Sequence, residues 1–497
     1  MFALAVWLRV YRLSDPIAGF HAFNEGFYVN ISLADMHRGL FAWFTHPLDL
    51  NNPPLYSLVV TTLFRLFGQS VELARLVSVV SGIVTVWLVF ELGRTLFDKR
   101  TGVVGAMILA LMPGAVLVGR NAQVDPLLVA LMFGSVVCWV HASAREEGGD
   151  WWALAGGLLL GFALVTKLPA VLVVPGLIVY QTVRSRAWKW VRERRTWAFI
   201  GASATVPLVW YAARFALDRG AFVSTQANLA DVASSLPNLD TAWHVMFVEP
   251  FWMIGAATAV LMIAGIVAMA RSRTAGDVLV GIESLTCIVF LVVYHYHIYY
   301  WLPATPFFAL VAARGLASVT KSSRAWFASV TVATALVLAL SSAVMLSGQK
   351  WGAWSAAQLQ PLVASPADGV VIAVDDDLWN NDMAPVMQYY LPARAILRED
   401  QPAPPGTLRV LDLQVLPPEG LSPQMVENDR VAATLVRPVV FGWAVMQEPS
   451  HLNYFGNGEW TFERVEPWWY FGIDTEVAGG DYGLYDITAQ VLGSQQP

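Results

Sequence analysis

Charged side chains are scarce in this sequence. They make up 14% of its 497 residues, whereas hydrophobic residues make up 56%. A soluble globular domain carries about 25% charged residues, so this composition excludes an ordinary soluble protein. Repeated apolar runs of about 17–25 residues are long enough to cross a lipid bilayer as helices. The sequence therefore predicts a polytopic α-helical membrane protein.

Cysteine and an excess of positive charge are also lacking. The two cysteines, Cys138 and Cys287, lie inside apolar runs, as is typical of small buried side chains and not of a disulfide or metal pair. The formal net charge is −6, and because nucleic-acid binding requires a basic patch, we expect no nucleic-acid partner. Tryptophan, in contrast, is abundant, with 21 residues. Several stand at the ends of apolar runs, where interfacial anchors are found.

About eleven apolar runs predict membrane spans in the first part of the chain. Residues Met1 to Leu13 form the first run, which is about half the length of a full span. We expect a first helix whose beginning is short or lies outside this sequence. The other predicted spans are Leu76–Leu92, Val103–Val118, Pro126–Ala142, Trp152–Val165, Pro169–Thr182, Trp197–Phe215, Pro250–Ala270, Val278–Val293, Leu302–Ala313 and Ala325–Leu346.

The cations of the connecting loops predict the orientation. Arg and Lys follow alternate spans and are densest between Arg184 and Arg195. Loops rich in Arg and Lys remain in the cytoplasm, and all of them fall on one side if residues 52–68 form a helix that does not cross. The predicted outer segments are then residues 19–67, the Arg120–Asp125 link, Lys167, residues 216–249, the His295–Trp301 cluster and the tail from Gly348.

The tail, residues 348–497, differs in character from the rest of the chain. Proline and glycine separate short β-rich runs at residues 370–374, 408–413, 433–441 and 460–465. This pattern predicts a small α/β domain, which the orientation places on the extracytoplasmic side. We therefore expect a transmembrane domain over residues 1–347 and an extracytoplasmic domain over residues 348–497, in a multi-pass protein of the cell (inner) membrane.

The first outer loop, residues 19–67, is polar, aromatic and marked by proline. Glu25 lies just past the end of the first apolar run, with Asn24 beside it and Tyr28 one turn later. Residues 24–39 can form a helix, and Pro53 with Pro54 opens a second one, because proline is tolerated at a helix start. This loop is a candidate for half of an active site.

Polar residues from distant parts of the sequence converge on the same predicted face. Ionisable residues near the hydrocarbon boundary are costly and are functional or paired. A carboxylate can accept a proton from an attacking hydroxyl, and cations can stabilise a phosphate leaving group. The candidate site residues are Asn24, Glu25, Tyr28, Asn52, Arg120, Asp125, Lys167, His295, His297 and Tyr300.

Each candidate also has a structural explanation. Glu25 could be an interfacial or capping carboxylate, and Asp125 stands before Pro126 as a helix N-cap would. Arg120 could pair with Asp125, and Lys167 could extend its ammonium to the lipid headgroups. The histidine–tyrosine cluster could belong to an aromatic belt. Their convergence on one face, under an orientation derived from other residues, favours the functional interpretation.

The ordered set of motifs resembles the GT-C class of integral-membrane glycosyltransferases. It is most similar to the branch that contains protein O-mannosyltransferases and the aminoarabinose transferase of lipid A. The residues that carry the resemblance, over about residues 1–320, are Asn24-Glu25 with Tyr28, Asn52-Pro53-Pro54-Leu55, Leu96 to Gly102, Arg120 with Asp125, Lys167-Leu168-Pro169, and His297 with Tyr300, Pro303 and Pro306.

The resemblance implies about eleven to thirteen helices and a polyprenyl- or dolichyl-phosphate sugar donor. It also implies an inverting transfer on the extracytoplasmic side to a protein, lipid or glycan acceptor. Asn24 stands where the family has an aspartate, and Asn52 where a Lys or His is common. Glu25 then becomes the expected base, while Lys167, Arg120 and His297 are expected to hold the phosphate. Asp125 would position the acceptor or help to hold a divalent cation, although no ligand spacing in the sequence demands a metal.

Two other classes of function stay open. The first is a transporter or flippase of a lipid-linked glycan, but such proteins place their sites near mid-membrane between repeated halves, and no paired halves are found here. The second is a non-catalytic glycan-assembly protein, in which Asn24 marks lost chemistry. The glycosyltransferase hypothesis is favoured because the polar residues gather at helix ends.

Overall fold

The computed structural model describes most of the apolar part of the chain and five strands of the tail. The described residues are 2–15, 17, 22–38, 54–145, 147–186, 188–217, 219–220, 223, 250, 253–293, 298–321, 323–348, 372–374, 389, 396–398, 408–412, 430–438 and 477–486. Contacts between Cα atoms divide the chain into two compact units. The first, here called the membrane unit, contains Met1–Leu13 and Ser32–Ala343, and the second contains Ser14–Ile31 and Val344–Pro497. The predicted domain limits, 1–347 and 348–497, stay a prediction.

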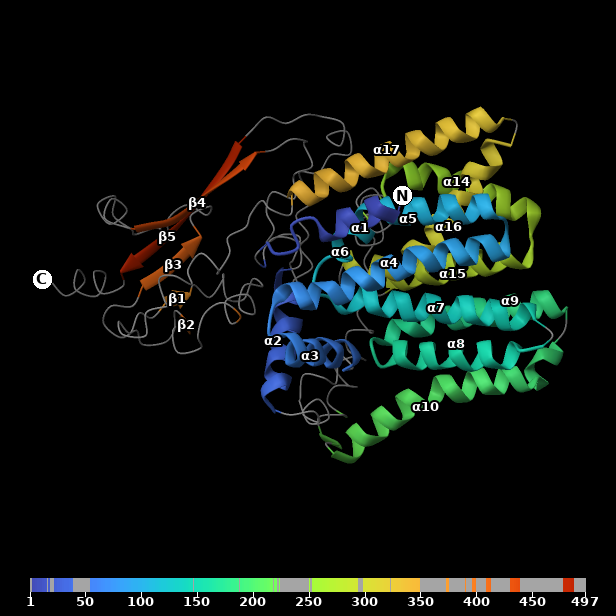
Figure 1. Cartoon of the computed structure of the whole chain (residues 1–497), viewed down its shortest axis with the longest axis horizontal. Coiled ribbons are helices and arrows are strands. Elements are labelled where there is room, and N and C mark those ends of the chain that lie inside the picture. The colour runs from blue at the N-terminus through green and yellow to red at the C-terminus, as the bar shows by residue number, and fades with distance from the viewer. Residues whose placement is uncertain are drawn as a thin grey trace, which may run out of the picture. The chain divides into compact units, whose positions relative to one another are not determined.

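Every predicted span contains a helix (Figure 1). The described helices are α1 (Phe2–Val10), α2 (Ala22–Arg38), α3 (Leu55–Phe67), α4 (Val71–Leu96), α5 (Lys99–Leu111), α6 (Pro113–Val118), α7 (Val124–Ala144), α8 (Gly149–Leu164), α9 (Val174–Ser185), α10 (Arg194–Leu217), α14 (Ala256–Ser272), α15 (Ala275–Val293), α16 (Thr305–Val319) and α17 (Arg324–Gly348). Short 3₁₀ helices are η3 (Leu168–Val173), η4 (Trp188–Arg192) and η6 (Ile298–Ala304).

Seven helical segments among the described residues are long and apolar enough to cross a membrane. Three more apolar helices are shorter: α3, α8 and α14. The chain is therefore a multi-pass membrane protein, while the count of about eleven spans stays a prediction. Helix α3 begins after Pro54 and ends at Gly68, whose φ is +88°, as expected for a helix that glycine terminates.

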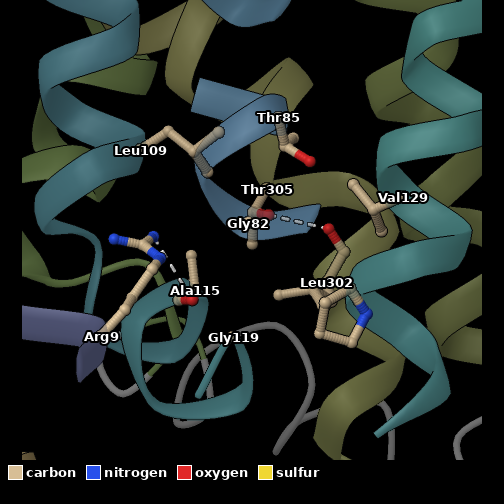
Figure 2. Close-up of a pocket in the computed structure, with 10 residues that line it drawn as sticks. Arg9, Gly82, Thr85, Leu109, Ala115, Gly119, Val129, Leu302 and Thr305 are labelled. Atoms are coloured by element: carbon tan, nitrogen blue, oxygen red, sulfur yellow. Dashed lines mark hydrogen bonds between the residues drawn. The ribbon is translucent and has the colours of Figure 1, made fainter. Parts of the chain in front are cut away.

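The predicted span 103–118 is broken into two helices. Pro113 has no amide hydrogen and interrupts the helical hydrogen bonds, so α5 ends at Leu111 and α6 begins at Pro113. Two carbonyls at the break find other donors. Arg9 Nη1 donates to the carbonyl of Ala110 at 3.1 Å, and Ser342 Oγ donates to the carbonyl of Leu111 at 2.7 Å. Figure 2 shows the buried Arg9 guanidinium beside Ala115 of α6. The break is thereby stabilised by α1 and α17.

Glycine permits very close contact between neighbouring helices. A Cβ atom at Gly265 of α14 would lie 2.0 Å from the carbonyl oxygen of Val311, and one at Gly315 of α16 would lie 2.0 Å from that of Leu261. No larger residue fits at either position without displacing a helix. Small residues at the contact are how membrane helices pack without a hydrophobic driving force between them.

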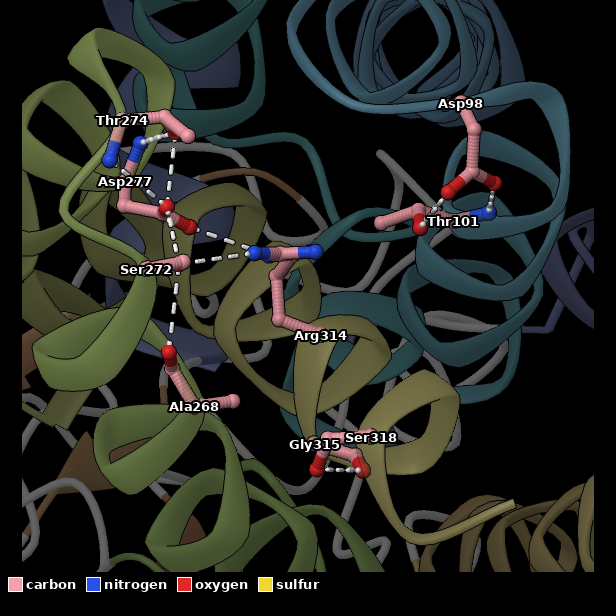
Figure 3. A network of polar contacts seen from close by, with 9 residues as sticks. All are labelled: Asp98, Thr101, Ala268, Ser272, Thr274, Asp277, Arg314, Gly315 and Ser318. Atoms are coloured by element: carbon pink, nitrogen blue, oxygen red, sulfur yellow. Dashed lines mark hydrogen bonds and ion pairs between the residues drawn. The ribbon is translucent and has the colours of Figure 1, made fainter. Parts of the chain in front are cut away.

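The turns that carry most loop cations lie together at one end of the membrane unit, here called the basic end. Arg314, in the second half of α16, donates to Asp277 at 3.0 Å (Figure 3). Its guanidinium also lies over the ring of Phe97, which follows α4. Arg195, in the first turn of α10, donates to the carbonyl of Ala142 near the end of α7 at 2.9 Å. His141 and Glu91, 2.9 Å apart, join α7 to α4. The predicted sorting of basic and non-basic loops thus matches the packing, while which end faces the cytoplasm stays a prediction.

The described strands of the second unit form a mixed five-stranded sheet in the order β2-β1-β3-β5-β4. Strand β1 (Ile372–Val374) is parallel to β2 (Ile396–Arg398) and β3 (Leu408–Asp412). Strand β5 (Val477–Asp486) is antiparallel to β3 and to β4 (Arg430–Pro438). Three of the predicted β-rich runs overlap these strands, and residues 460–465 lie outside the described residues. The α/β class of the tail stays a prediction, because the elements described there are strands.

Candidate functional site

Three helix ends bring a buried ion pair and two tyrosines together at the end of the membrane unit opposite the basic end. Lys167 Nζ lies 2.9 Å from Asp125 Oδ1. The same nitrogen lies 4.5 Å from the ring centroid of Tyr299 and 4.5 Å from that of Tyr300. None of the four residues is more than 8% exposed. This group is called the Lys167 cluster below.

Asp125 is placed by the start of α7. The helix begins at Val124 with Gln123 as its N-cap, so Asp125 lies in the first turn and is not the N-cap that its position before Pro126 suggests. A carboxylate in the first turn interacts favourably with the helix dipole. Ser78 of α4 donates to the carbonyl of Gln123 at 3.0 Å and accepts from its amide at 3.3 Å. The start of α7 is therefore fixed against α4.

Lys167 is placed by a tight link between α8 and η3. The amides of Thr166 and Lys167 both donate to the carbonyl of Ala163 at 2.9 Å, which closes the end of α8. Lys167 itself is extended, with φ −166° and ψ 141°, and Pro169 follows at the start of η3. Because Lys167 is buried and paired, its ammonium does not extend to the lipid headgroups, which corrects that structural explanation.

Two effects act in opposite directions on the pKa of Lys167. Burial lowers the pKa of the Lys167 ammonium, and the nearby Asp125 charge acts against this decrease. The two aromatic faces also favour the charged form, because an ammonium over a ring is attracted to its quadrupole. A buried ion pair recovers its desolvation cost only when its geometry is good. The presence of this buried pair is therefore weak evidence that the pair serves only to stabilise the fold.

Arg120 does not pair with Asp125 among the described residues. Its Nη2 donates instead to the backbone carbonyl of Tyr11 and, at 3.3 Å, to that of Arg12. Arg75 donates to the carbonyl of Leu13 at 2.6 Å. Two arginines from α4 and from the α6–α7 link therefore hold the backbone that follows α1. The alternative in which Arg120 is the partner of Asp125 is wrong, because Lys167 occupies that place.

The first-loop candidates lie on α2, and the predicted helix over residues 24–39 corresponds to it. Asn24, Glu25 and Tyr28 are buried, at 7%, 2% and 6% exposure. The Nδ2 of Asn24 has no hydrogen-bond partner in the part of the chain that the structure describes, whereas the ring of Tyr28 meets that of Phe27 edge-on at 5.5 Å. These three residues belong to the second unit, so the structure brings together Asp125, Lys167 and Tyr300 but describes the α2 residues separately.

Three predicted site residues, Asn52, His295 and His297, lie outside the described residues. One residue of the cluster was missed: Tyr299 was not a candidate, although it precedes Tyr300 in the same aromatic run. The motif spacing selected Tyr300, and only the 3₁₀ geometry of η6 places both rings beside Lys167. Among the described residues, no three His, Cys, Asp or Glu side chains lie close enough to hold a metal ion.

Residues 51–211 match the family model described as Dolichyl-phosphate-mannose-protein mannosyltransferase, a segment that contains Asp125 and Lys167. Two curated proteins of Bacillus subtilis (strain 168) are similar. "Putative mannosyltransferase YycA" is 25% identical over 140 residues, 28% of this chain and 20% of the relative. "Putative mannosyltransferase YkcB" is 26% identical over 162 residues, 32% of this chain and 22% of the relative. The matches span about a fifth of the length of these relatives.

Solved structures show the fold. ArnT from Cupriavidus metallidurans bound to undecaprenyl phosphate superposes with a TM-score of 0.61 at 16% identity, over 87% of this chain and 94% of that one. Its apo state gives 0.63 at 15% identity over the same shares. The Archaeoglobus fulgidus oligosaccharyltransferase in the apo form gives 0.51 at 13% identity, over 80% of this chain and 63% of that one. The resemblance to GT-C integral-membrane glycosyltransferases is thereby confirmed.

Proposed function

We propose that this chain, which resembles GT-C glycosyltransferases in sequence and in fold, transfers a sugar from a polyprenyl-phosphate donor to a hydroxyl acceptor on the extracytoplasmic face of the membrane. Support for a lipid donor comes from ArnT, whose structure with undecaprenyl phosphate shares the fold. Support for the class of transfer comes from the mannosyltransferase family matched by residues 51–211.

The observation that carries the proposal is the Lys167 cluster. A cation and a carboxylate are buried together at helix ends, with two tyrosine rings against the cation. Polar residues of this kind at membrane depth are expensive to bury and mark substrate sites. Their position at the end of the membrane unit that lacks the basic turns agrees with an extracytoplasmic site.

The chemistry follows a single displacement. The acceptor hydroxyl oxygen attacks the anomeric carbon, the bond from that carbon to the phosphate oxygen breaks, and the sugar inverts its configuration. Glu25 takes the hydroxyl proton. Polyprenyl phosphate leaves with the bonding electrons, and its charge is stabilised by Lys167, Arg120 and His297.

The remaining candidates position the two substrates. Asp125 orients the Lys167 ammonium and helps to place the acceptor. Tyr28 and Tyr300 line the sugar site. The Nδ2 of Asn24, which has no hydrogen-bond partner among the described residues, donates a hydrogen bond to a substrate oxygen. A buried donor without a partner costs about 1–3 kcal/mol, which a bound sugar hydroxyl would offset.

The test is release of polyprenyl phosphate from a panel of polyprenyl-phosphate sugars by the purified chain in nanodiscs, with candidate acceptors present. We expect release by the wild type and a loss of at least about 100-fold in Glu25→Gln, since general-base catalysis contributes about 10²–10⁴-fold. Glu72→Gln is the matched control, because Glu72 is a carboxylate in the first turn of α4, and it should stay within twofold of the wild type.

Three results would contradict the proposal. Full sugar transfer by a folded Glu25→Gln variant would remove the assigned base. Movement of a lipid-linked glycan across a proteoliposome without a transfer product would indicate a transporter. Donor binding without turnover across the acceptor panel would indicate a non-catalytic assembly protein.

A further inference from the structure

The turn between α9 and α10 is the most basic segment of the chain and contains none of the candidate site residues. Residues 184–197 carry six cations and one carboxylate, Glu193. Three exposed tryptophans lie in or beside it: Trp188 at 64% exposure, Trp197 at 59% and Trp151 at 69%. Residues 184–197 together with Trp151 are called the Trp–Arg turn below.

The Trp–Arg turn is held rigidly against the α7–α8 turn. Trp190 is buried and donates its indole N–H to Thr182 at 3.2 Å, and the Trp190 carbonyl accepts from the Thr196 hydroxyl at 2.7 Å. Arg195 donates to the carbonyls of Ala142 and Arg145 at 2.9 and 3.1 Å. The exposed tryptophans therefore stand on a fixed support and do not belong to a collapsed apolar core.

Five of the six cations divide into ion-paired and unpaired groups, and the sixth, Arg184, donates to the carbonyl of Ser143 at 3.2 Å. Arg195 lies 2.6 Å from Glu193, and Arg194 lies 3.6 Å from Asp150. In contrast, Arg186, Lys189 and Arg192 are exposed, and none has an ion-pair partner in the part of the chain that the structure describes. The three unpaired cations lie within one short segment that also carries the exposed Trp188 and Trp197.

Arg186 also occupies an unusual backbone conformation. It ends α9 with φ +53° and ψ 19°, in the left-handed region. Glycine or asparagine usually occupies this position at a helix end. Arg186 therefore places a cation in the turn at a position where the backbone favours glycine or asparagine.

We propose that the Trp–Arg turn binds the phosphate groups of anionic phospholipid headgroups. Tryptophan prefers the membrane–water interface, where its ring is apolar and its N–H is wet. Each Lys or Arg near an anionic leaflet contributes to binding, and three together correspond to roughly a hundredfold. The turn thus selects anionic over zwitterionic lipids and does not act only as a topological signal.

The test is native mass spectrometry of the full chain released from nanodiscs of phosphatidylcholine with a fixed fraction of phosphatidylglycerol. We expect the wild type to retain phosphatidylglycerol over phosphatidylcholine. The triple variant Arg186→Gln, Lys189→Gln, Arg192→Gln should lose at least about tenfold of this preference. Because these side chains are exposed and lack ion-pair partners among the described residues, its melting temperature should stay near that of the wild type.

The matched control removes the same charge elsewhere at the basic end. Lys99, Lys321 and Arg324 are exposed cations outside the Trp–Arg turn, and their triple glutamine variant should keep the wild-type lipid preference. If both variants lost the preference for phosphatidylglycerol equally, the net charge of the protein would explain the preference, and the proposal would be overturned. An unchanged preference in the first variant would also overturn it, as would displacement of the lipid by millimolar inorganic phosphate, which would indicate a site for free phosphate.

Discussion

Two ion pairs with buried carboxylates, one at each end of the membrane unit, differ in how many protein donors surround the carboxylate. Asp277 accepts from Arg314, from the Thr274 amide and hydroxyl, and from the Ser272 hydroxyl (Figure 3). Arg314 donates to Ser272 as well and lies over Phe97. This pair is a closed network that joins the α14–α15 turn to α16.

The Asp125–Lys167 pair is supported far less by other protein donors. Among the described residues, the side-chain donor to Asp125 is Lys167, and the remaining neighbours of the ammonium are the Tyr299 and Tyr300 rings. Buried polar groups are normally fully hydrogen-bonded. From this difference we infer that the Asp277 pair serves stability, and we propose that the less enclosed Lys167 cluster is available to a ligand.

The largest effect is expected from Lys167→Met, which leaves the buried Asp125 charge alone. Breaking a buried pair in this way costs about 3–5 kcal/mol of unfolding free energy, and polyprenyl-phosphate release should fall at least about 100-fold because a phosphate-stabilising cation is lost. Thermal unfolding and the release assay measure the two effects. The double variant Asp125→Asn, Lys167→Met should recover stability but not release. Recovery of release as well would mean that the pair is only structural.

The pH dependence of release should differ between lysine and arginine at this position. Because burial lowers the pKa of Lys167, the ammonium loses its proton below the ordinary lysine value of about 10.4. Release should then fall about tenfold for each pH unit above the lowered pKa. The contribution of this group to folding stability has the opposite sign and rises with pH in that window, since the unfolded chain binds more protons.

Lys167→Arg provides the comparison for this pH effect, because arginine stays charged throughout the accessible range. Any release that this variant retains should show no alkaline decrease below pH 10. The same alkaline limb in both proteins would assign the titration to another group.

A smaller effect is expected from the tyrosines. Tyr299→Leu and Tyr300→Leu each remove a ring from the ammonium, and a desolvated cation–π contact is worth about 1–2 kcal/mol, or roughly five- to thirtyfold in release. The phenylalanine variants keep the ring and should stay closer to the wild type. Equal losses in the leucine and phenylalanine variants would show that the hydroxyl groups, and not the rings, carry the effect.

The smallest effect on release is expected at the basic end. Arg314→Gln removes one donor of the closed network, so unfolding should become easier by about 1–3 kcal/mol while release stays within twofold of the wild type. Measurements below the melting temperature of the variant separate the two quantities. A hundredfold loss of release in a folded Arg314→Gln protein would contradict the assignment of the Asp277 pair to stability.

The helices could be predicted because long apolar runs admit few alternatives in a membrane. The break at Pro113 was missed because the run through it is apolar on both sides, and only the donors from Arg9 and Ser342 make the interruption tolerable. In the tail, β2 and β5 were missed. Strand β2 is only three residues long, and β5 contains two consecutive glycines, Gly479 and Gly480, which weaken the strand pattern.

The site was predictable as a set of residue types but not as a set of contacts. Loop cations predicted that Asp125, Lys167 and Tyr300 share one end, which the structure confirms for these three residues. The sequence could not assign partners, since Arg120 and Lys167 were equally available to Asp125. Which cation reaches it depends on the α8–η3 link and on the carbonyls of Tyr11 and Arg12 that engage Arg120.

The most direct test of the difference between the two ends replaces one carboxylate of each pair by its amide. Asp125→Asn and Asp277→Asn each replace a buried carboxylate and leave its cation without a counter-charge, so they match in the group removed and differ in place. Polyprenyl-phosphate release per folded molecule, measured in nanodiscs, should fall at least about 100-fold in Asp125→Asn and stay within twofold of the wild type in Asp277→Asn. Equal release by the two variants would contradict the account, because the Lys167 cluster would then be no more than a second structural ion pair.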